Sequence, residues 1–521
     1  ANKDNIPFVE DVDEKKPLTE DEVSPDNIVI DQEQPPVDPF NLDFCLEDGW
    51  TMARQSMSYC GEMIGVILVT ILREVIIFFF TREKGVAVAE AITSFVLIYA
   101  LFSFAVPWAI STLYMFRVAE SIAAQNFVLI GKYTNKMNVI MLVLGAIMTV
   151  LFCTAAPAIF GKLSHSQEAV DHLTGMLRWF SISVIPNFWM ITFFKLFPIM
   201  GKLSVIVIIL VINLVIQIAL NYVFIMVLDL TDFGIGIGFF ITSALTLVGC
   251  LVYWFKWKPL EPAMIPVCDG VCEEFGEFLS NSMNVGTTIF FSMFALEFLP
   301  FFALIIGDTA YTVVNMTSIL ITFVSLFSES LNVGNNILIN YCIGKKYYDK
   351  IGDIFTTTIY LNLAYIVLVE TLFMVFFYKI MRLFSDEDYI TEIALTQKVP
   401  FFFASTLTNF HNMLSETTVI LGGQNYSMMS TLVGRFGLSI VLALIMIFTD
   451  FGITSILLGY ILGQSVSLIL NAGYLISLFS NNKKKLYLTL LEIAAFYEMQ
   501  AEMSAKADAA KKLEEDKEKK E

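Results

Sequence analysis

Long apolar runs occupy most of the chain and are separated by short polar segments. An α-helix of about 20 residues spans the roughly 30 Å of hydrocarbon in a bilayer. Because lipid offers the backbone no hydrogen-bond partner, such runs must form helices. We therefore predict an all-α polytopic membrane protein with twelve transmembrane helices, near residues 57–81, 92–122, 138–160, 173–197, 203–228, 234–255, 283–306, 310–340, 354–378, 399–421, 428–448 and 452–479.

A repeated pentapeptide indicates that these helices form two related halves. The sequence TDFGI stands at residues 231–235 and again at 449–453, each time between two apolar runs. The stretch ESIAAQNFVLIGKY, from Glu120, is similar to ESLNVGNNILINYCIGKKYY, from Glu329. We predict two pseudo-symmetric six-helix lobes that enter the membrane in the same orientation. Asp and Gly suit tight turns, so we expect both TDFGI copies to form the turn before the last helix of each lobe.

Polar segments at both ends and in the middle divide the chain into five parts. Residues 1–52 are rich in Asp, Glu and Pro, which predicts a disordered, acidic cytoplasmic tail. The two lobes are expected at 53–257 and 282–480. The residues between them, 258–281, contain prolines and a glutamate cluster and predict a cytoplasmic inter-lobe linker. Residues 481–521 begin basic and amphipathic and end in mixed charge, which predicts an interfacial helix followed by a solvated cytoplasmic tail.

Composition and charge support the membrane assignment. The chain of 521 residues is 56% hydrophobic and only 16% charged, whereas soluble domains carry about 25% charged residues. Lys and Arg are more frequent in the segments that share a side with the termini, among them Lys345, Lys346 and the run at 483–485. This bias predicts that both termini are cytoplasmic. We expect a multi-pass protein of the plasma membrane or an endomembrane.

The sequence does not indicate an enzyme or a metal protein. The loops are short, there are 3 histidines, and no nucleophile and base stand at a catalytic spacing. The 7 cysteines show no paired pattern. Cys268 and Cys272 of the CDGVC segment lack nearby partners, so we predict no metal site and no resident cofactor. No filter-like segment recurs, which disfavours a channel.

Three stretches carry a resemblance to a known family. They are NYVFIMVLDLTDFGIGIGFFITSA from Asn221, FFSMFALEFLPFFALIIG from Phe290 and NILINYCIGKKYYDK from Asn336. In order and spacing they resemble the multidrug and toxic compound extrusion (MATE) family, over roughly residues 57–480. The resemblance implies a secondary transporter that works by alternating access.

The resemblance also implies candidate cation ligands. Glu297 matches the glutamate in the seventh helix of eukaryotic members. A second acid often follows it by five positions, but Phe302 stands there in this chain. The acid of the tenth helix in the family falls near Asn409. Either Asn409 or Glu416 is therefore the candidate second ligand.

Charged residues within the apolar runs are costly to bury and are therefore candidates for function. Glu297 is followed by Pro300, which lacks an N–H group and predicts a kink beside the carboxylate. We predict that Glu297 binds the coupling ion, H⁺ or Na⁺. Most other charged residues in the runs, such as Arg435 and Glu370, are expected to pair with opposite charges or to reach the membrane interface.

Residues at matched places in the two halves suggest a central cavity. Lys195 and Glu416 precede Gly201 and Gly423 by similar distances along the chain. Their opposite charges could meet across the cleft in one access state, or each could be solvated separately. The repeat-related Glu120 and Glu329 are expected to line the substrate cavity.

The leading functional hypothesis is a multidrug efflux antiporter. It would export organic, cationic compounds in exchange for H⁺ or Na⁺ by alternating access. The alternative is a lipid-linked oligosaccharide flippase of the same superfamily, which should need a more basic cavity. The expected partners are small organic substrates and the lipid bilayer. We expect a monomer with no nucleic-acid partner.

Overall fold

The computed structural model describes six continuous stretches of the chain, together with scattered residues between 51 and 84 and residues 486 and 490. Every regular element in this part of the chain is helical, which confirms the predicted all-α class. The first predicted span, 57–81, and both predicted tails lie largely outside the described residues. The described stretches are residues 86–154, 167–266, 269–303, 305–384, 388–448 and 452–480.

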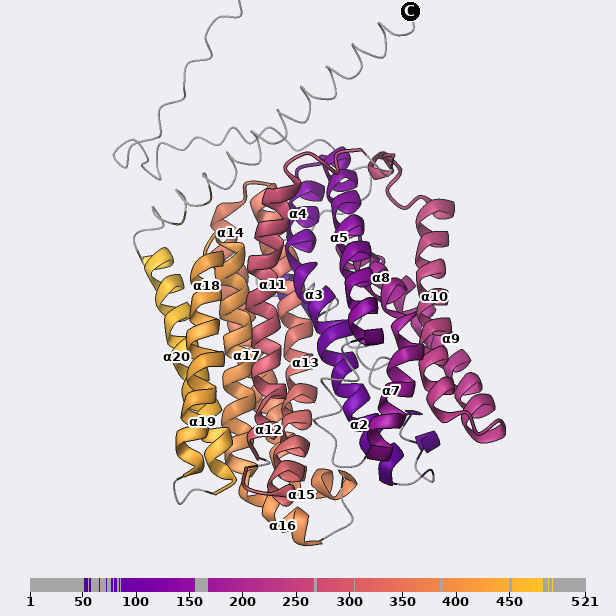
Figure 1. Cartoon of the computed structure of the whole chain (residues 1–521). Coiled ribbons are helices and arrows are strands. Elements are labelled where there is room, and N and C mark those ends of the chain that lie inside the picture. Colours follow the sequence, from indigo (N-terminus) through magenta and orange to yellow (C-terminus); the bar gives the residue numbers. More distant parts are fainter. Residues whose placement is uncertain are drawn as a thin grey trace, which may run out of the picture.

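The helices of the N-lobe follow one another up and down the bundle (Figure 1). The second span is one broken helix, and the fourth is a pair of helices bent by 57°. In chain order the elements are α2 (Val86–Ile98), η1 (Tyr99–Ala105), α3 (Val106–Ile110), α4 (Thr112–Ala123), α5 (Phe127–Thr154), α7 (Gln167–Ser181), α8 (Val184–Ile199), α9 (Leu203–Asn221), η2 (Tyr222–Val227) and α10 (Thr231–Trp257).

The C-lobe repeats this pattern after a short linker that contains η3 (Glu261–Ala263). Three of its spans are broken or contain a π-helical segment. The elements are α11 (Phe275–Glu297), α12 (Leu299–Ala303), α13 (Asp308–Gly344), α14 (Tyr348–Tyr365), η4 (Ile366–Glu370), α15 (Thr371–Phe384), α16 (Asp388–Thr396), α17 (Lys398–Ile420), α18 (Gln424–Ser430), η5 (Thr431–Leu438), α19 (Ser439–Ile447) and α20 (Thr454–Ser480).

Every predicted span from 92–122 onward coincides with one of these helices or broken helices. In the described part, 8 helices are long and apolar enough to cross a membrane, or 9 if the bent pair α7 and α8 is one span. Helices α11 and α17 are not among them because their many Ser, Thr and Asn residues lower their mean hydropathy. These two polar helices carry the predicted cation ligands.

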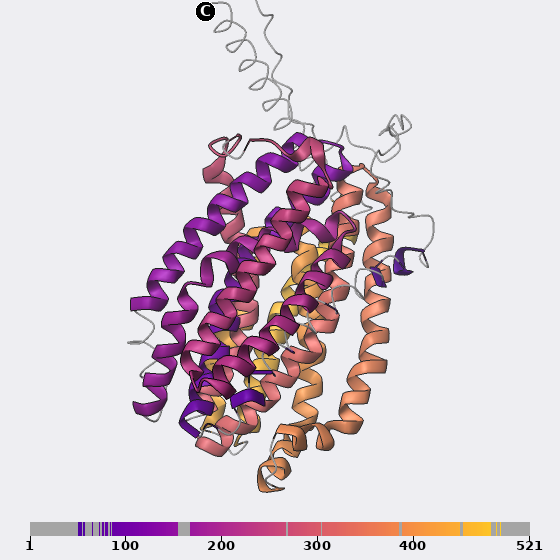
Figure 2. The same ribbon diagram turned by 90° about the vertical axis from the view of Figure 1, so that its right-hand side faces the viewer.

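The two lobes meet along α13, which packs against α4, and along α11, which packs against α3. Glycines bring the helices close together. A Cβ atom on Gly344 would lie 2.5 Å from the backbone oxygen of Glu120, and one on Gly286 would lie 3.0 Å from Ile110. We call the end of the bundle with the linker the linker face, and the opposite end, with α16, the far face (Figures 1 and 2).

Two separate hydrophobic cores show where the lobes part. One core joins N-lobe residues to C-lobe residues near the linker face, such as Val333, Ile351 and Leu475. The other core lies in the far half of the C-lobe, from Ala295 to Tyr460, and contains no N-lobe residue among those described. The lobes therefore share a core in the linker half and have separate cores in the far half.

The first TDFGI copy is shifted relative to the predicted turn. The turn is made by the preceding residues, with Asp229 at a φ of 56°, and Thr231 already begins α10. Asp232 in the first turn of this helix bonds to Nδ1 of His172 at 2.9 Å. The motif thus starts a helix rather than forming the turn. The second copy lies partly outside the described residues.

The linker is bound to the N-lobe. Asn135 on α5 donates to the carbonyl oxygens of Pro266 at 2.8 Å and of Asp269 at 3.2 Å. Lys132 forms an ion pair with Glu273 at 3.1 Å. Helix α11 begins at Phe275, inside the segment predicted as linker. These contacts fix the linker along the start of α5.

Candidate functional site

Three of the predicted site residues come together between the lobes. Glu416 on α17 accepts a hydrogen bond from Asn336 at 2.5 Å, and Glu329 on α13 accepts one from Asn412 at 3.4 Å. The two carboxylates are close enough to interact with each other. Lys195 on α8 lies within electrostatic range of both. These three groups therefore lie in one region of the protein, where α8 of the N-lobe approaches α13 and α17 of the C-lobe.

Lys195 has its nearest partners in its own lobe. Its Nζ lies 3.4 Å from the centroid of the Trp108 ring and 3.4 Å from Oγ1 of Thr112. A cation over an indole face is favourable when both are desolvated, and Lys195 is only 2% exposed. It forms no ion pair with Glu416 among the described residues in this conformation. A direct pair between them remains a prediction for another access state.

A ladder of buried asparagines borders the two carboxylates. Asn332, Asn336 and Asn340 recur every fourth residue on α13 and are at most 2% exposed. The side-chain oxygens of Asn336 and Asn340 accept no hydrogen bond from the described residues. Sequence reasoning considered only charged residues here and missed this ladder, although its helical spacing is visible in the sequence. The ladder gives the region beside Glu416 additional polar groups that a ligand could use.

Glu297 lies at a break in its helix. It is the last residue of α11, and the chain resumes helical structure as α12, in which Pro300 stands in the first turn. Oγ1 of Thr322 donates to the Glu297 carboxylate at 3.1 Å. Glu297 has no contact with Glu416 or Glu329 among the described residues. Glu297 is therefore a polar site in the C-lobe that is separate from the pair Glu329 and Glu416.

A row of aromatic rings leads along α11 to Glu297. The rings of Phe290 and Phe294 stack with centroids 5.4 Å apart, and those of Phe294 and Phe298 with centroids 5.1 Å apart. Phe291 and Phe294 also pack on Phe436 of the eleventh span. These rings are partly exposed, so they offer apolar faces beside the carboxylate.

Arg435 is a buried cation whose hydrogen-bond partners are neutral side chains. Its guanidinium donates to Ser292 at 2.7 Å, to Asn412 at 2.6 Å and to Tyr460 at 3.3 Å. It forms no ion pair within the described part of the chain, so the expectation that it pairs with an acid is wrong. Asn412 accepts from Arg435 and donates to Glu329, and it thereby connects the arginine to the central carboxylates.

Asn409 has a partner that the sequence did not suggest. Its Nδ2 donates at 2.5 Å to Glu370, a carboxylate on the neighbouring ninth span. Glu370 is fully buried and also forms no ion pair among the described residues. The expectation of a paired or interfacial Glu370 is therefore wrong, because neutral side chains of α17 satisfy it.

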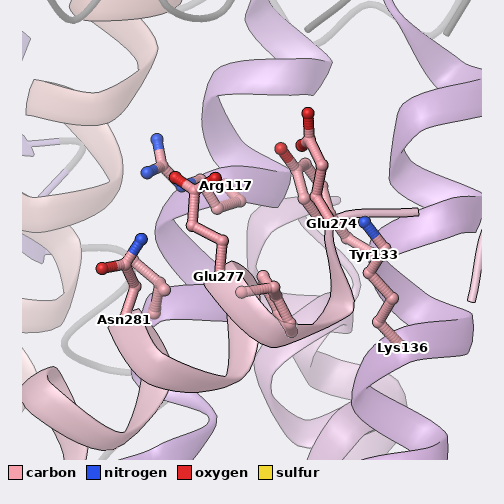
Figure 3. Close-up of a pocket in the computed structure, with 8 residues that line it drawn as sticks. Arg117, Tyr133, Lys136, Glu274, Glu277 and Asn281 are labelled. Atoms are coloured by element: carbon pink, nitrogen blue, oxygen red, sulfur yellow. The ribbon is translucent and has the colours of Figure 1, made fainter. Parts of the chain in front are cut away.

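Glu120 is placed apart from Glu329. It is 7% exposed, bonds to Arg117 at 3.4 Å within α4, and lies where Gly344 of α13 contacts the same helix. A small charged pocket adjoins this contact, lined by Leu113, Arg117, Tyr133, Lys136, Glu274, Glu277, Phe278 and Asn281. In Figure 3, Glu277 points towards Arg117. These groups lie near the linker face, where α13 packs against α4 and α11 packs against α3. We call this contact between the lobes the seam.

No group of three or more His, Cys, Asp or Glu side chains that could hold a metal ion occurs in the part of the chain described. Cys272 of the CDGVC segment is a free thiol, and Cys268 lies outside the described residues. The candidate site is thus built from carboxylates, two buried cations and neutral amides and hydroxyls.

The chain is similar to a family model and to solved transporter structures. The MatE family model matches residues 62–223 and 285–445, once in each half. The eukaryotic MATE transporter AtDTX14 superposes with a TM-score of 0.78 at 16% identity, over 86% of this chain and 100% of that chain. A multidrug resistance MATE family transporter in an outward-facing conformation gives 0.73 at 16% identity, over 83% and 97%.

A third structure extends the comparison to a wider superfamily. A MOP superfamily transporter from Pyrococcus furiosus, described as having a binding pocket of reverse polarity, gives a TM-score of 0.75 at 16% identity, over 84% of this chain and 98% of that chain. No curated protein sequence matches this chain. The family model covers more than half of the sequence and repeats in the two lobes; the chain is a multi-pass membrane transporter of the MATE family.

Proposed function

We propose that this transporter is a cation-coupled antiporter for organic, cationic compounds. The observation that carries the proposal is the pair of interacting carboxylates, Glu329 and Glu416, at the place where the shared core of the lobes ends. Two carboxylates that lie this close together attract a positive charge, because a cation relieves their mutual repulsion. The aromatic row on α11 supplies apolar faces of the kind that organic cations prefer.

Alternating access would proceed by rocking of the two lobes. The seam of α13 with α4 and of α11 with α3 closes the linker half, and the separate cores leave the far half free to open. With both termini in the cytoplasm, as the Lys and Arg bias favours, this conformation faces outward.

The coupling ion, H⁺ or Na⁺, would act at Glu297. This carboxylate lies at a helix break and, among the described residues, accepts a hydrogen bond from the Thr322 hydroxyl. Half-helix ends and broken helices commonly hold coupling ions in transporters. Ion binding at Glu297 would favour one arrangement of the C-lobe, and release would favour the other, so that the gradient drives substrate outward.

The flippase alternative requires a basic cavity for a phosphorylated lipid. Lys195 and Arg435 are the buried cations near the centre. Glu329 and Glu416 lie within electrostatic range of Lys195, and Glu329 also within that of Arg435. The two carboxylates offset the two cations, so the site lacks the excess of positive charge that a phosphorylated lipid would require.

Transport in reconstituted vesicles tests the proposal directly. Proteoliposomes are loaded with a fluorescent organic cation, and either an H⁺ or a Na⁺ gradient is imposed. We expect gradient-dependent export that stops when the gradient is collapsed. Export under neither gradient, together with movement of a lipid-linked sugar across the same vesicles, would favour the flippase.

We expect Glu416→Lys to reduce transport by about ten-fold or more, because it places a second cation within electrostatic range of Lys195. The double exchange, Glu416→Lys with Lys195→Glu, should recover part of this loss if the two groups face one another in the cycle. The matched control is Glu392→Lys on exposed α16. Initial transport rates at equal amounts of inserted protein give the comparison, and an unrecovered double exchange contradicts the pairing.

A further inference from the structure

A buried ammonium group lies near the two central carboxylates without pairing with them. Lys195 is within electrostatic range of Glu329 and Glu416. Within the described part of the chain, neither carboxylate forms an ion pair with a Lys, Arg or His side chain. Buried charges are as a rule paired with opposite charges, so other groups hold Lys195 in its place.

The indole ring of Trp108 supplies the main contact. The Nζ atom of Lys195 lies 3.4 Å from the ring centroid, within the roughly 6 Å over which an aromatic face attracts a cation. Lys195 is 2% exposed and Trp108 is 8% exposed, and the attraction is strongest when both partners are desolvated. Phe104 stacks on the indole with ring centroids 5.4 Å apart, which helps to fix the plane of the ring.

The hydroxyl group of Thr112 supplies a second contact. Its oxygen lies 3.4 Å from the Nζ atom of Lys195. Its single hydrogen is donated to the backbone carbonyl oxygen of Trp108 at 3.0 Å, which leaves the oxygen free to accept from the ammonium. Trp108 on α3 and Thr112 on α4 thus bind the same amine from consecutive helices. We call these two side chains the lysine dock.

The two carboxylates have neutral hydrogen-bond partners instead. Asn336 donates to Glu416 at 2.5 Å, and Asn412 donates to Glu329 at 3.4 Å. Neutral donors lower the cost of burying a carboxylate but do not cancel its charge. An ammonium that reached the pair would cancel part of this charge and would occupy the place of an organic cation. The position of Lys195 therefore decides whether the pair is available.

We propose that Trp108 and Thr112 hold the ammonium of Lys195 away from Glu329 and Glu416, so that the carboxylates stay available to an organic cation. This assignment rests on the proposed function, because it takes the two carboxylates as the cation site. The flexible four-carbon stem of lysine lets the ammonium leave the dock for the carboxylates. Trp108 is then a positioning residue, which acts on the substrate through Lys195.

Equilibrium binding of radioactive tetraphenylphosphonium to the purified, full-length protein tests the dock. We expect Trp108→Leu to weaken binding by about ten-fold, because the undocked Lys195 moves to the carboxylates. Thr112→Val keeps the shape of the side chain but removes its oxygen, so it should weaken binding by several-fold. Trp257→Leu is the matched control, since Trp257 is exposed at the end of α10, and it should bind like the wild-type protein.

A second substitution separates positioning from direct contact. Lys195→Met removes the ammonium and keeps an unbranched apolar side chain, so adding it to Trp108→Leu or to Thr112→Val should restore binding. A double variant of Trp108→Leu with Lys195→Met that binds as weakly as Trp108→Leu alone would overturn the dock, because Trp108 would then act on the cation or on the fold directly.

Thermal unfolding shows which variants are folded. If Trp108→Leu does not fold, Thr112→Val with and without Lys195→Met decides the question. Wild-type affinity in the folded dock variants would also overturn the proposal. An absence of saturable binding by the wild-type protein would contradict the proposed cation site and the dock together, whereas a failed rescue contradicts the dock alone.

Discussion

Glu297→Gln is expected to fold and to bind substrate, yet to lose gradient-driven export almost completely. Gln keeps the volume of the side chain and can still accept the hydrogen bond from Thr322, but it has no charge to gain or lose. A coupling site that cannot change its charge cannot respond to ion binding. Export under an imposed gradient, measured beside substrate binding at equilibrium, separates the two effects.

Two companion variants sharpen this test. Glu297→Asp keeps a carboxylate but withdraws it by one methylene, so partial export should remain. Pro300→Ala restores a backbone N–H in the first turn of α12 and should weaken coupling without touching the carboxylate. A Glu297→Gln protein that exports at the wild-type rate under a gradient would remove Glu297 from the mechanism.

Gly344→Val is expected to abolish most transport by forcing the lobes apart at the linker face. A Cβ at this position would lie 2.5 Å from the backbone oxygen of Glu120 and 2.6 Å from Cβ of Ala123, both on α4. Contacts this short require the helices to move, because neither partner is the end of a flexible side chain. The equilibrium should shift away from the conformation in which α13 rests on α4.

The shift can be measured as a distance at the far face. Spin labels at Glu168→Cys and Glu392→Cys, both exposed, report the separation of the lobes in a background without native cysteines. We expect a shorter distance in Gly344→Val than in the parent protein. The control is Gly352→Val, where a Cβ would meet nothing within 4 Å. If Val prevents folding, Gly344→Ala is the milder variant, and an unchanged distance in it contradicts the proposed seam.

The overall fold was largely predictable because an apolar run long enough to span the membrane as a helix satisfies its own backbone hydrogen bonds in lipid by forming that helix. The places where helices break were not predictable in the same way. The π-helical segment at Ile366–Glu370 and the bend between α7 and α8 arise from packing between helices, and no local pattern marks them. The TDFGI copy at residues 231–235 shows a similar effect, since residues typical of turns stand in the first turn of a helix.

Only the charged residues of the candidate site could be predicted from the sequence. Glu416, Glu329 and Lys195 stood out because a charge in an apolar run is costly, and they lie near each other. Glu370 and Arg435 were expected to pair with opposite charges or to reach the membrane interface. Their neutral partners stand on other helices, which the sequence cannot align. The asparagine ladder on α13 carries no charge, so a search for charged residues passed over it, although its spacing of four residues is visible in the sequence.

The core shared by the lobes also constrains how the protein can be made. It joins Leu113 and Ile140, from early in the chain, to Leu475 and Leu478, near the end of α20. A ribosome adds about 5–20 residues per second, so the early helices are in the bilayer for tens of seconds before the last members of this core emerge. During that interval the surfaces of α17, η5 and α19 that α20 later covers face lipid or a helper protein. A nascent chain that stalls before Leu475 cannot complete this core.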